Sequence, residues 1–220
     1  MVPVSAENGH QTLSRQQART EATRRKLLRS AEYAFARHGF EATRIEDVAA
    51  SAGYTRGAFY ANFKSKEDLF MALLEDVVRR RIADVQGRLS EAQTPSDKAD
   101  VLRDYYAHFA IQRTWSLIFL EFKLFAVRYP RVRARLQERL QNLRATANHM
   151  LREISEALGH RTPVSSTAAV AAMGALSNAL LLEQLVDPDA ISPAELHTLL
   201  SAFFDLITGE DRRFAPRRSR

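Results

Sequence analysis

The stretch GYTRGAFYANFKSKEDLF, residues 53–70, decides how this 220-residue chain is interpreted. Two glycines, Gly53 and Gly57, stand among residues that otherwise predict short helices. Thr55 is the predicted N-cap of a short helix that carries Gly57, and Ser65 is the predicted N-cap of a longer one. Because a glycine inside a helix costs about 1 kcal/mol relative to alanine, Gly57 indicates a place where the backbone has to stay bare.

The composition is that of a soluble globular protein, with 45% hydrophobic and 26% charged residues. The 8 glycines and 7 prolines lie mostly between long periodic segments, which predicts an all-α fold. No apolar run is long enough to span a membrane, and the first residues lack the apolar segment of a secretory signal. We therefore expect a cytoplasmic protein with no membrane partner.

The lack of cysteine and the basic charge limit the chemistry further. With no cysteine, disulfides, thiolate metal sites and a cysteine nucleophile are excluded, and the composition is compatible with a reducing cytoplasm. A net charge of +6 and a pI of about 9.9 favour a polyanionic partner, although many basic chains have none.

Apolar periodicity in the first third predicts four helices. The first runs from Thr20 to His38, with Gly39 as its C-cap. Thr43 and Glu46 have the spacing of a capping box, which predicts a short second helix ending at Gly53. The short helix after Thr55 and a long helix from Ser65 to about residue 89 follow. Further helices are predicted over residues 97–109, 114–130, 130–159, 163–187 and 192–209, and the one over 114–130 is apolar on nearly every side, which is typical of a buried helix.

Two short helices joined by a tight turn and braced by a preceding helix match a helix-turn-helix unit, whose second helix enters the DNA major groove. In that arrangement Arg56 suits a bidentate bond to a guanine edge, and a bare Gly57 allows close approach. Tyr60 would reach a phosphate, while Phe63 would pack beneath the turn. Lys64 and Lys66, with Thr43, would complete a phosphate clamp.

Each of these residues also has a purely structural interpretation. Arg56, Lys64 and Lys66 would equally form a solvated face. Gly57 would equally pack against another helix, and Tyr60 would equally lie in the core. The clustering of all of them within two short helices and one helix start favours the DNA-binding interpretation.

The segment from Thr23 to about Glu75, with RRKLLRSAEYAFARHGFEATRIEDVAASAGYTRGAFYANFKSKEDLF, resembles the DNA-binding domain of the TetR family of bacterial transcriptional regulators. The resemblance implies a third helix that reads a double-stranded DNA operator and a fourth helix whose start holds phosphate. It departs from common family usage at Arg44, usually smaller and uncharged, and at Glu46, where a basic residue is frequent. A solvated arginine is as good an account of Arg44 as a DNA contact. The predicted DNA-binding residues are Thr43, Arg44, Thr55, Arg56, Gly57, Ala58, Tyr60, Asn62, Lys64 and Lys66.

The resemblance also implies a small-molecule pocket in the C-terminal helices and a homodimer formed by the last two long helices. Aromatic residues gather in one stretch and would line a pocket for a planar or apolar ligand, although tight core packing explains the same pattern. The candidate ligand-binding residues are Tyr105, His108, Phe109, Trp115, Phe119 and Phe122.

These observations predict an all-α protein with four parts: an N-terminal arm at 1–18, a helix-turn-helix domain at 19–80 with its motif at about 44–63, a ligand-binding and dimerisation domain at 81–209, and a basic tail at 210–220. The predicted function is a repressor released from its operator by a ligand. A helical enzyme is disfavoured, because the chain has no Glu-x-x-His pair, no phosphate loop and no nucleophile with a base, and no cofactor or metal is expected. The alternative is a non-specific DNA- or RNA-binding protein that uses the arginines around Arg131 to Arg139.

Overall fold

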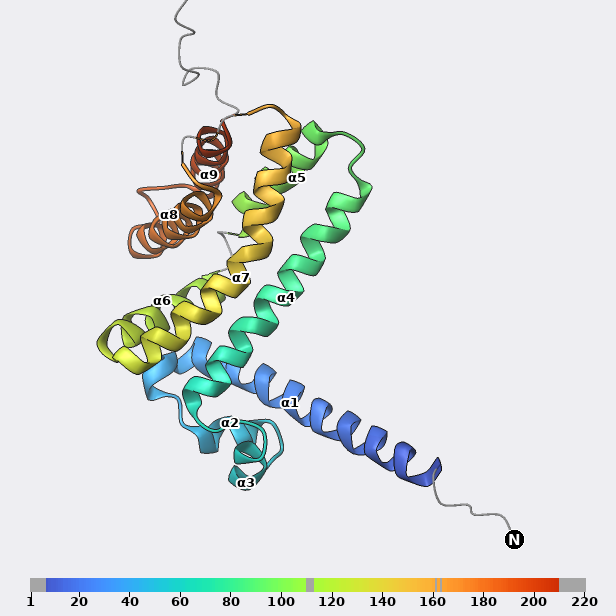
Figure 1. The fold of residues 1–220 in the computed structure, drawn as a ribbon. Coiled ribbons are helices and arrows are strands. Elements are labelled where there is room, and N and C mark those ends of the chain that lie inside the picture. The colour runs from blue at the N-terminus through green and yellow to red at the C-terminus, as the bar shows by residue number, and fades with distance from the viewer. Residues whose placement is uncertain (1–6, 110–112, 161, 163, 210–220) are drawn as a thin grey trace, which may run out of the picture. The chain divides into compact units, whose positions relative to one another are not determined.

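The computed structural model describes residues 7–109, 113–160, 162 and 164–209, and within them the regular structure is entirely α-helical (Figure 1). The predicted all-α fold is confirmed. The chain divides into two compact units, Met1–Leu74 and Glu75–Arg220, and helix α4 (Lys66–Glu91) crosses the division. The predicted basic tail lies outside the described residues.

The first unit packs α1 (Glu7–Ala42), α2 (Ile45–Ser51) and α3 (Arg56–Tyr60) with the start of α4. Aromatic rings form much of its core, with the rings of Phe35, Phe40 and Phe70 at centroid distances of 5.5–6.0 Å. Burying each large apolar side chain contributes roughly 1.5–3 kcal/mol. The buried apolar residues of this unit include Leu27, Leu28, Ala31, Phe35, Phe40, Val48, Ala49, Phe59, Phe63, Leu69 and Phe70.

Helix α1 starts earlier than the sequence predicts. It begins at Glu7 rather than near Thr20, so most of the predicted N-terminal arm is helical. Residues 15–19 of this segment, RQQAR, are all good helix formers even without an apolar face. At Gly39 the backbone (φ +78°, ψ 169°) is not helical, so the predicted break at this glycine is confirmed.

The second unit contains five further helices in its described part. α5 packs against α9, α7 packs against both α6 and α8, and α8 packs against α9. Its core consists of Tyr106, Ala107, Leu151, Ala169, Leu196, Leu200, Phe204 and Ile207. The helices are α5 (Pro95–Phe109), α6 (Arg113–Arg128), α7 (Pro130–Ala157), α8 (Ser166–Val186) and α9 (Pro193–Thr208).

Helix α9 begins after Ser192 and ends before Gly209, as predicted, and both of its ends are capped. Ser192 Oγ accepts the N–H of Glu195 at 3.2 Å, and the carboxylate of Glu195 accepts the N–H of Ser192 at 2.9 Å, which completes a capping box. The Ser192 hydroxyl also donates to Glu195 Oε2 at 2.6 Å, and this bond, followed by that from the Ser192 N–H, lowers the pKa of Glu195. Gly209 closes the helix in the left-handed conformation.

Two helices of the second unit keep apolar side chains exposed. α6 is not buried on all sides as predicted, because it buries one face, including Trp115 and Phe122, and exposes Leu124 and Val127. Among the described helices, α8 is long and apolar enough to cross a membrane. The core or interface helix of a soluble protein has the same composition, so this is weak evidence for a membrane span.

Candidate nucleic-acid interface

A glycine with a left-handed backbone fixes the turn between α2 and α3. The N–H of Gly53 donates to the carbonyl of Ala50 at 2.9 Å, and the N–H of Tyr54 donates to that of Ala49 at 2.8 Å. This is the Schellman arrangement, which needs a positive φ at the residue after the C-cap. Gly53 has φ +79°, so the angle between the two helices depends on this glycine.

Helix α3 has a buried and an exposed side. Thr55 Oγ1 accepts the N–H of Ala58 at 3.2 Å and caps the helix as predicted. Phe59 and Phe63 are buried with their ring centroids 5.6 Å apart, which confirms that Phe63 packs beneath the turn. Tyr60 is 43% exposed, so it is not a core tyrosine.

Arg56, the first residue of α3, pairs with a carboxylate on α2. Its Nη1 lies 3.0 Å from Oε1 of Glu46, and both side chains are exposed. Its guanidinium lies 5.5 Å from the centre of the Tyr60 ring. The Tyr60 hydroxyl, and after it the charge of Glu46, raises the pKa of Arg56. Glu46, which departs from common family usage, therefore lies where it can orient the arginine that is predicted to read bases.

The space outside Gly57 is open. A Cβ placed on this residue would meet only Thr55 Oγ1, at 3.7 Å, which is an ordinary van der Waals contact. Gly57 also has no positive φ. Within the described part of the chain, neither the backbone nor a neighbouring helix requires a glycine here. The structure therefore gives no support to Gly57 as a packing glycine, and the close approach of DNA at this residue stays a prediction.

Asn62 closes the end of α3. Its Nδ2 donates to the carbonyl of Ala58 at 2.8 Å, and its own carbonyl accepts from Arg24 Nη1 at 3.4 Å. The guanidinium of Arg24 lies 4.6 Å from the centre of the Phe63 ring. Ala58 and Asn62 are both half-buried, so each presents less surface to a partner than the exposed Arg56 and Gly57.

Thr43 does not occupy its predicted position. The side chain is 4% exposed. Its hydroxyl donates to the carbonyl of Gly39 at 2.7 Å, and the carbonyl of Ala34 is a second acceptor at 3.2 Å. Arg44 stands at the N-cap of α2 and makes no side-chain capping bond. The predicted capping box is therefore wrong, because the hydroxyl of Thr43 closes the interruption of α1. That buried hydroxyl is not offered to phosphate, whereas Arg44 is exposed.

The two lysines at the start of α4 have different surroundings. Lys64 is exposed. Lys66 Nζ donates to the carbonyls of Glu41 at 2.8 Å and Thr43 at 3.0 Å, and lies 4.8 Å from the centre of the Phe40 ring. Burial lowers the pKa of Lys66. Lys66 thus ties the start of α4 to the end of α1 with two of its three ammonium hydrogens, and its contact with phosphate stays a prediction.

The predicted cap of α4 is confirmed at Ser65. Its Oγ accepts the N–H of Asp68 at 3.2 Å, while Asp68 Oδ2 accepts the N–H of Lys64 at 3.2 Å. This reciprocal pair fixes the backbone that carries both lysines.

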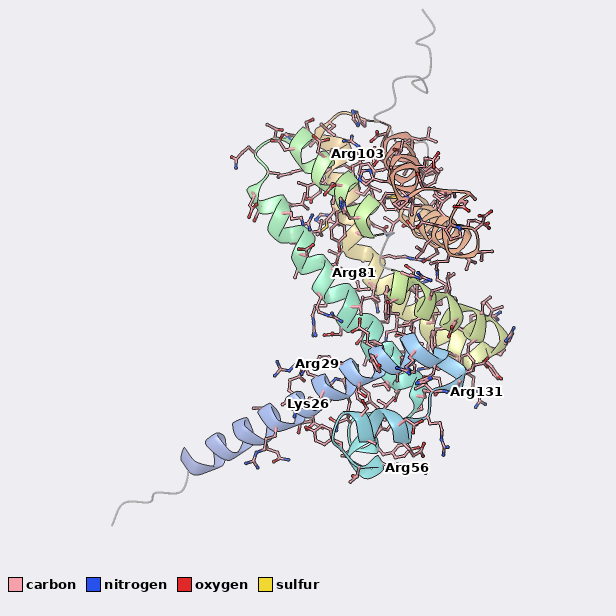
Figure 2. The ribbon with its side chains drawn as sticks, turned by 180° about the vertical axis from the view of Figure 1, so that it is seen from behind. Lys26, Arg29, Arg56, Arg81, Arg103 and Arg131 are labelled. Carbon is pink, nitrogen blue, oxygen red and sulfur yellow. The ribbon has the colours of Figure 1, made fainter. Side chains whose placement is uncertain are left out.

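Sequence reasoning missed two exposed cations on α1. Figure 2 shows Lys26 and Arg29 along α1 in the same unit as Arg56. Lys26 Nζ lies 5.8 Å from the centre of the Tyr54 ring, which belongs to the turn before α3. The run of basic residues before Leu27 was the signal that could have found them, because one side of α1 is buried and the charges have to lie on the other.

The predicted ligand-binding aromatics are partly brought together. Trp115 and Phe119 stack with centroids 6.0 Å apart and planes 10° apart. The guanidinium of Arg81 lies 5.8 Å from the Trp115 ring centre, and Lys123 Nζ lies 4.4 Å from that of Phe119. Burial, with repulsion from Arg144, lowers the pKa of Lys123. We call Arg81, Trp115, Phe119 and Lys123 the cation–aromatic stack.

The other predicted ligand-binding residues differ in their burial and contacts. Tyr105 donates from its hydroxyl to the carbonyl of Arg81 at 3.0 Å, and burial raises its pKa to about 12. Phe122 is fully buried. His108 is exposed and faces Asp104 and His197, so its side chain does not belong to a buried wall. The side chain of Phe109 lies outside the described residues.

Comparison with known families decides the identity. Residues 27–73 match the bacterial regulatory proteins of the tetR family, and residues 93–206, more than half of the chain, match the tetracyclin repressor-like C-terminal domain. The chain belongs to the TetR family. It is a helix-turn-helix, DNA-binding transcriptional regulator, and the relatives that it matches are transcriptional regulators rather than enzymes.

Named relatives match over about two fifths of the chain. The repressor AcnR of Corynebacterium diphtheriae is 31% identical over 85 residues, which is 39% of this chain and 40% of that protein. The regulator TtgR of Pseudomonas putida is 34% identical over 82 residues, 37% of each chain. The matched segment thus spans about two fifths of these relatives.

Solved structures match the fold over most of the chain. The fatty acid degradation regulator FadR of Bacillus halodurans superposes with a TM-score of 0.67 at 17% identity, covering 86% of this chain and 96% of that one. FadR of Bacillus subtilis in complex with stearoyl-CoA gives 0.63 at 17% identity, covering 84% and 97%. A regulator of Saccharomonospora viridis in complex with choline gives 0.66 at 18% identity, covering 84% and 96%.

Proposed function

We propose that this regulator is a repressor that binds its operator as a homodimer, with α3 of each copy in a major groove. The observation that carries the proposal is the exposed side of α3, where Arg56 is oriented by Glu46 beside the open backbone at Gly57. Arg56 would bond a guanine edge, and Gly57 would let the helix approach the base edges. Arg44, Tyr60 and Lys64 would contact phosphates, which fix the register of the protein on the duplex.

The dimer is supported by exposed apolar side chains on the last two helices. Leu182 and Val186 lie four residues apart on α8, and Leu199 lies on α9, all exposed. Most of the apolar length of α8 is not buried within the chain. A second copy that packs α8 and α9 against the same pair would bury these side chains in a four-helix interface.

The cation–aromatic stack supports an anionic ligand with an apolar body. Arg81 and Lys123 flank the rings of Trp115 and Phe119, and Lys123 is held partly out of water. An anionic group would relieve the cost of that desolvated ammonium, whereas a cation such as choline would meet two positive charges. Among the ligands of the structural relatives, stearoyl-CoA fits this chemistry, so acyl thioesters are the class that we propose.

Release from the operator requires the ligand to favour one of two states. Bound ligand would stabilise a spacing of the two α3 helices that does not match successive major grooves. Because α4 crosses from the first unit to the second, it would carry this change. Such a regulator acts on the chromosome, so we propose a cytoplasmic location.

Non-specific nucleic-acid binding is the alternative function. The exposed Arg131 and Arg133 at the start of α7 would serve it. Arg139 on the same helix is already paired with Glu75, which neutralises part of that face. The geometry around Arg56 therefore supports sequence-specific binding better.

Two variants test the proposed reading of DNA. Arg56→Ala should reduce the preference for the operator over random DNA by about 10- to 100-fold, as expected for the loss of a bidentate base contact. Lys64→Ala should weaken binding to both DNAs alike and reduce the salt dependence by about one phosphate contact. Fluorescence anisotropy with both duplexes across a salt series measures these effects, and an Arg56→Ala variant that weakens both DNAs equally would contradict the base-reading role.

A further inference from the structure

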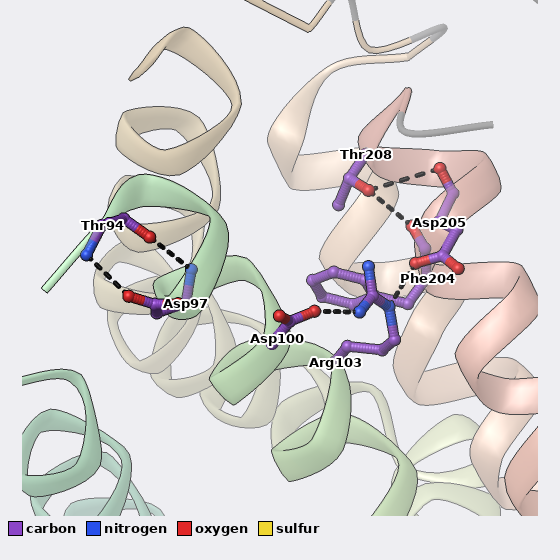
Figure 3. A network of polar contacts seen from close by, with 7 residues as sticks. All are labelled: Thr94, Asp97, Asp100, Arg103, Phe204, Asp205 and Thr208. Carbon is purple, nitrogen blue, oxygen red and sulfur yellow. Dashed lines mark hydrogen bonds and ion pairs between the residues drawn. The ribbon is translucent and has the colours of Figure 1, made fainter. Parts of the chain in front are cut away.

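The pairing of α5 with α9 is fixed by a polar network and by core contacts. Arg103 of α5 forms ion pairs with Asp205 of α9 and with Asp100 on its own helix (Figure 3). Its guanidinium lies 6.0 Å from the centre of the Phe204 ring, and the ring of Tyr106 lies 6.2 Å from the same ring. These contacts fix the register between α5 and α9 next to Asp104.

Farther along this pair, three potential metal ligands converge. Asp104 and His108 lie four residues apart on α5, and His197 lies on α9. One ligand atom from each lies within 4.8 Å of those of the other two. His108 Nδ1 is 3.0 Å from Asp104 Oδ1, and the two histidine rings are 5.5 Å apart at 79°.

We propose that Asp104, His108 and His197 bind a divalent transition metal ion, with zinc as the representative of the class. Imidazole and carboxylate together suit zinc, cobalt and nickel, whereas calcium and magnesium prefer oxygen ligands. Three protein ligands leave a fourth position for water. A surface ion pair would explain Asp104 and His108, but it gives no reason for His197 to arrive from another helix.

The geometry needs only a small adjustment. Ligand atoms around a tetrahedral zinc lie about 3.3 Å apart, given zinc–ligand bonds of about 2.0–2.1 Å. The separation of up to 4.8 Å therefore has to shrink by a side-chain rotation, which the exposed Asp104 and His108 permit. Arg88 lies 3.6 Å from Asp104 and competes for that carboxylate. Because this ion pair is exposed on both sides, it is weak and the metal displaces it.

The bound metal joins α5 to α9 across the helix pair. A ligand that binds only the folded state stabilises it in proportion to its affinity and concentration. The proposed metal site shares no residue with the cation–aromatic stack, so the titration with zinc tests it without the proposed acyl thioester.

The test is a calorimetric titration of the full chain, prepared without a polyhistidine tag, with zinc chloride. We expect one zinc ion per chain in the wild type and a loss of affinity of about tenfold or more in both His197→Ala and Asp104→Asn. His149→Ala is the matched control, because His149 on α7 also has a carboxylate four residues away, with Nε2 3.3 Å from Glu153 Oε1, and should bind zinc like the wild type.

A second readout separates ligation from misfolding. Cobalt in place of zinc should give a visible absorption band in the wild type that is lost in His197→Ala, while the helical circular dichroism of that variant is unchanged. Wild-type protein that binds no zinc, or a folded His197→Ala variant that binds it as tightly as the wild type, would overturn the proposal.

Discussion

Replacing Gly57 by alanine should move fold stability and DNA affinity in opposite directions. The added methyl group meets nothing closer than Thr55 Oγ1 at 3.7 Å, so the fold can accept it without strain. Alanine is favoured over glycine in a helix by up to about 1 kcal/mol. For a chain of this size that raises the melting temperature by about 2–4 °C.

The same methyl group should weaken operator binding. In the proposed complex the backbone at Gly57 approaches the base edges, and forcing one extra methyl into a packed contact costs about 1–3 kcal/mol. This corresponds to a rise in Kd of about 5- to 150-fold. A protein with better stability and poorer DNA binding is a combination that general damage to the fold does not produce.

Gly87→Ala is the control for this experiment. Gly87 also lies inside a helix, α4, with nothing within 4 Å of an added Cβ. It should gain similar stability and bind the operator like the wild type. Thermal melts and fluorescence anisotropy on operator DNA measure both quantities for the two variants. A Gly57→Ala variant with wild-type affinity would refute close approach at this position.

Three further substitutions test the remaining assignments. Glu46→Gln removes the partner of Arg56 and a negative charge near the proposed phosphate contacts. Fluorescence anisotropy should therefore show tighter binding to random DNA and a smaller preference for the operator. An unchanged preference would exclude the orientation of Arg56 by Glu46. Lys66→Met removes the bonds to the carbonyls of Glu41 and Thr43 and should lower the stability of the fold by about 1–2 kcal/mol in denaturant unfolding, whereas wild-type stability would show that these bonds contribute nothing. Lys123→Met should raise the melting temperature at neutral pH and weaken release by stearoyl-CoA. The folded state lowers the pKa of Lys123 below the ordinary 10.5. The stability lost by burying the charged ammonium is therefore greatest below the folded pKa and fades as pH rises toward 10.5. The advantage of Lys123→Met should shrink in melts at higher pH, and an advantage that does not change with pH would contradict this origin.

Local rules predicted the helix-turn-helix well. The end of α2 before Gly53, the caps at Thr55 and Ser65 and the burial of Phe63 depend on neighbours within a few residues, so spacing in the sequence is enough to predict them.

Contacts between distant residues could not be predicted in this way. The ammonium of Lys66 bonds carbonyls more than twenty residues away, because the tertiary fold brings these groups together. The hydroxyl of Thr43 bonds back to Gly39 on α1, and the spacing of Thr43 and Glu46 alone does not distinguish this bond from a cap of α2. The pair of Arg56 and Glu46 forms only because the turn folds α2 back along α3. The early start of α1 was missed because that segment has helix propensity without an apolar face.

Less of the candidate ligand site in the second unit could be predicted from the sequence. The aromatic stretch predicted that Trp115 and Phe119 belong together, but the cations at Arg81 and Lys123 come into the stack only through side-chain geometry. His108 was grouped with the aromatics by its place in the sequence, whereas the fold turns it toward His197, almost ninety residues away.

The most direct test of the central claim is the affinity of the wild-type protein for the intergenic DNA upstream of its own gene, compared with random DNA of equal length across a salt series. Sequence-specific recognition through α3 predicts binding to the upstream DNA that is at least about a thousandfold tighter at physiological salt. Both affinities should fall as salt rises, because phosphate contacts release counterions. Equal affinity for the two DNAs at every salt concentration would contradict the account.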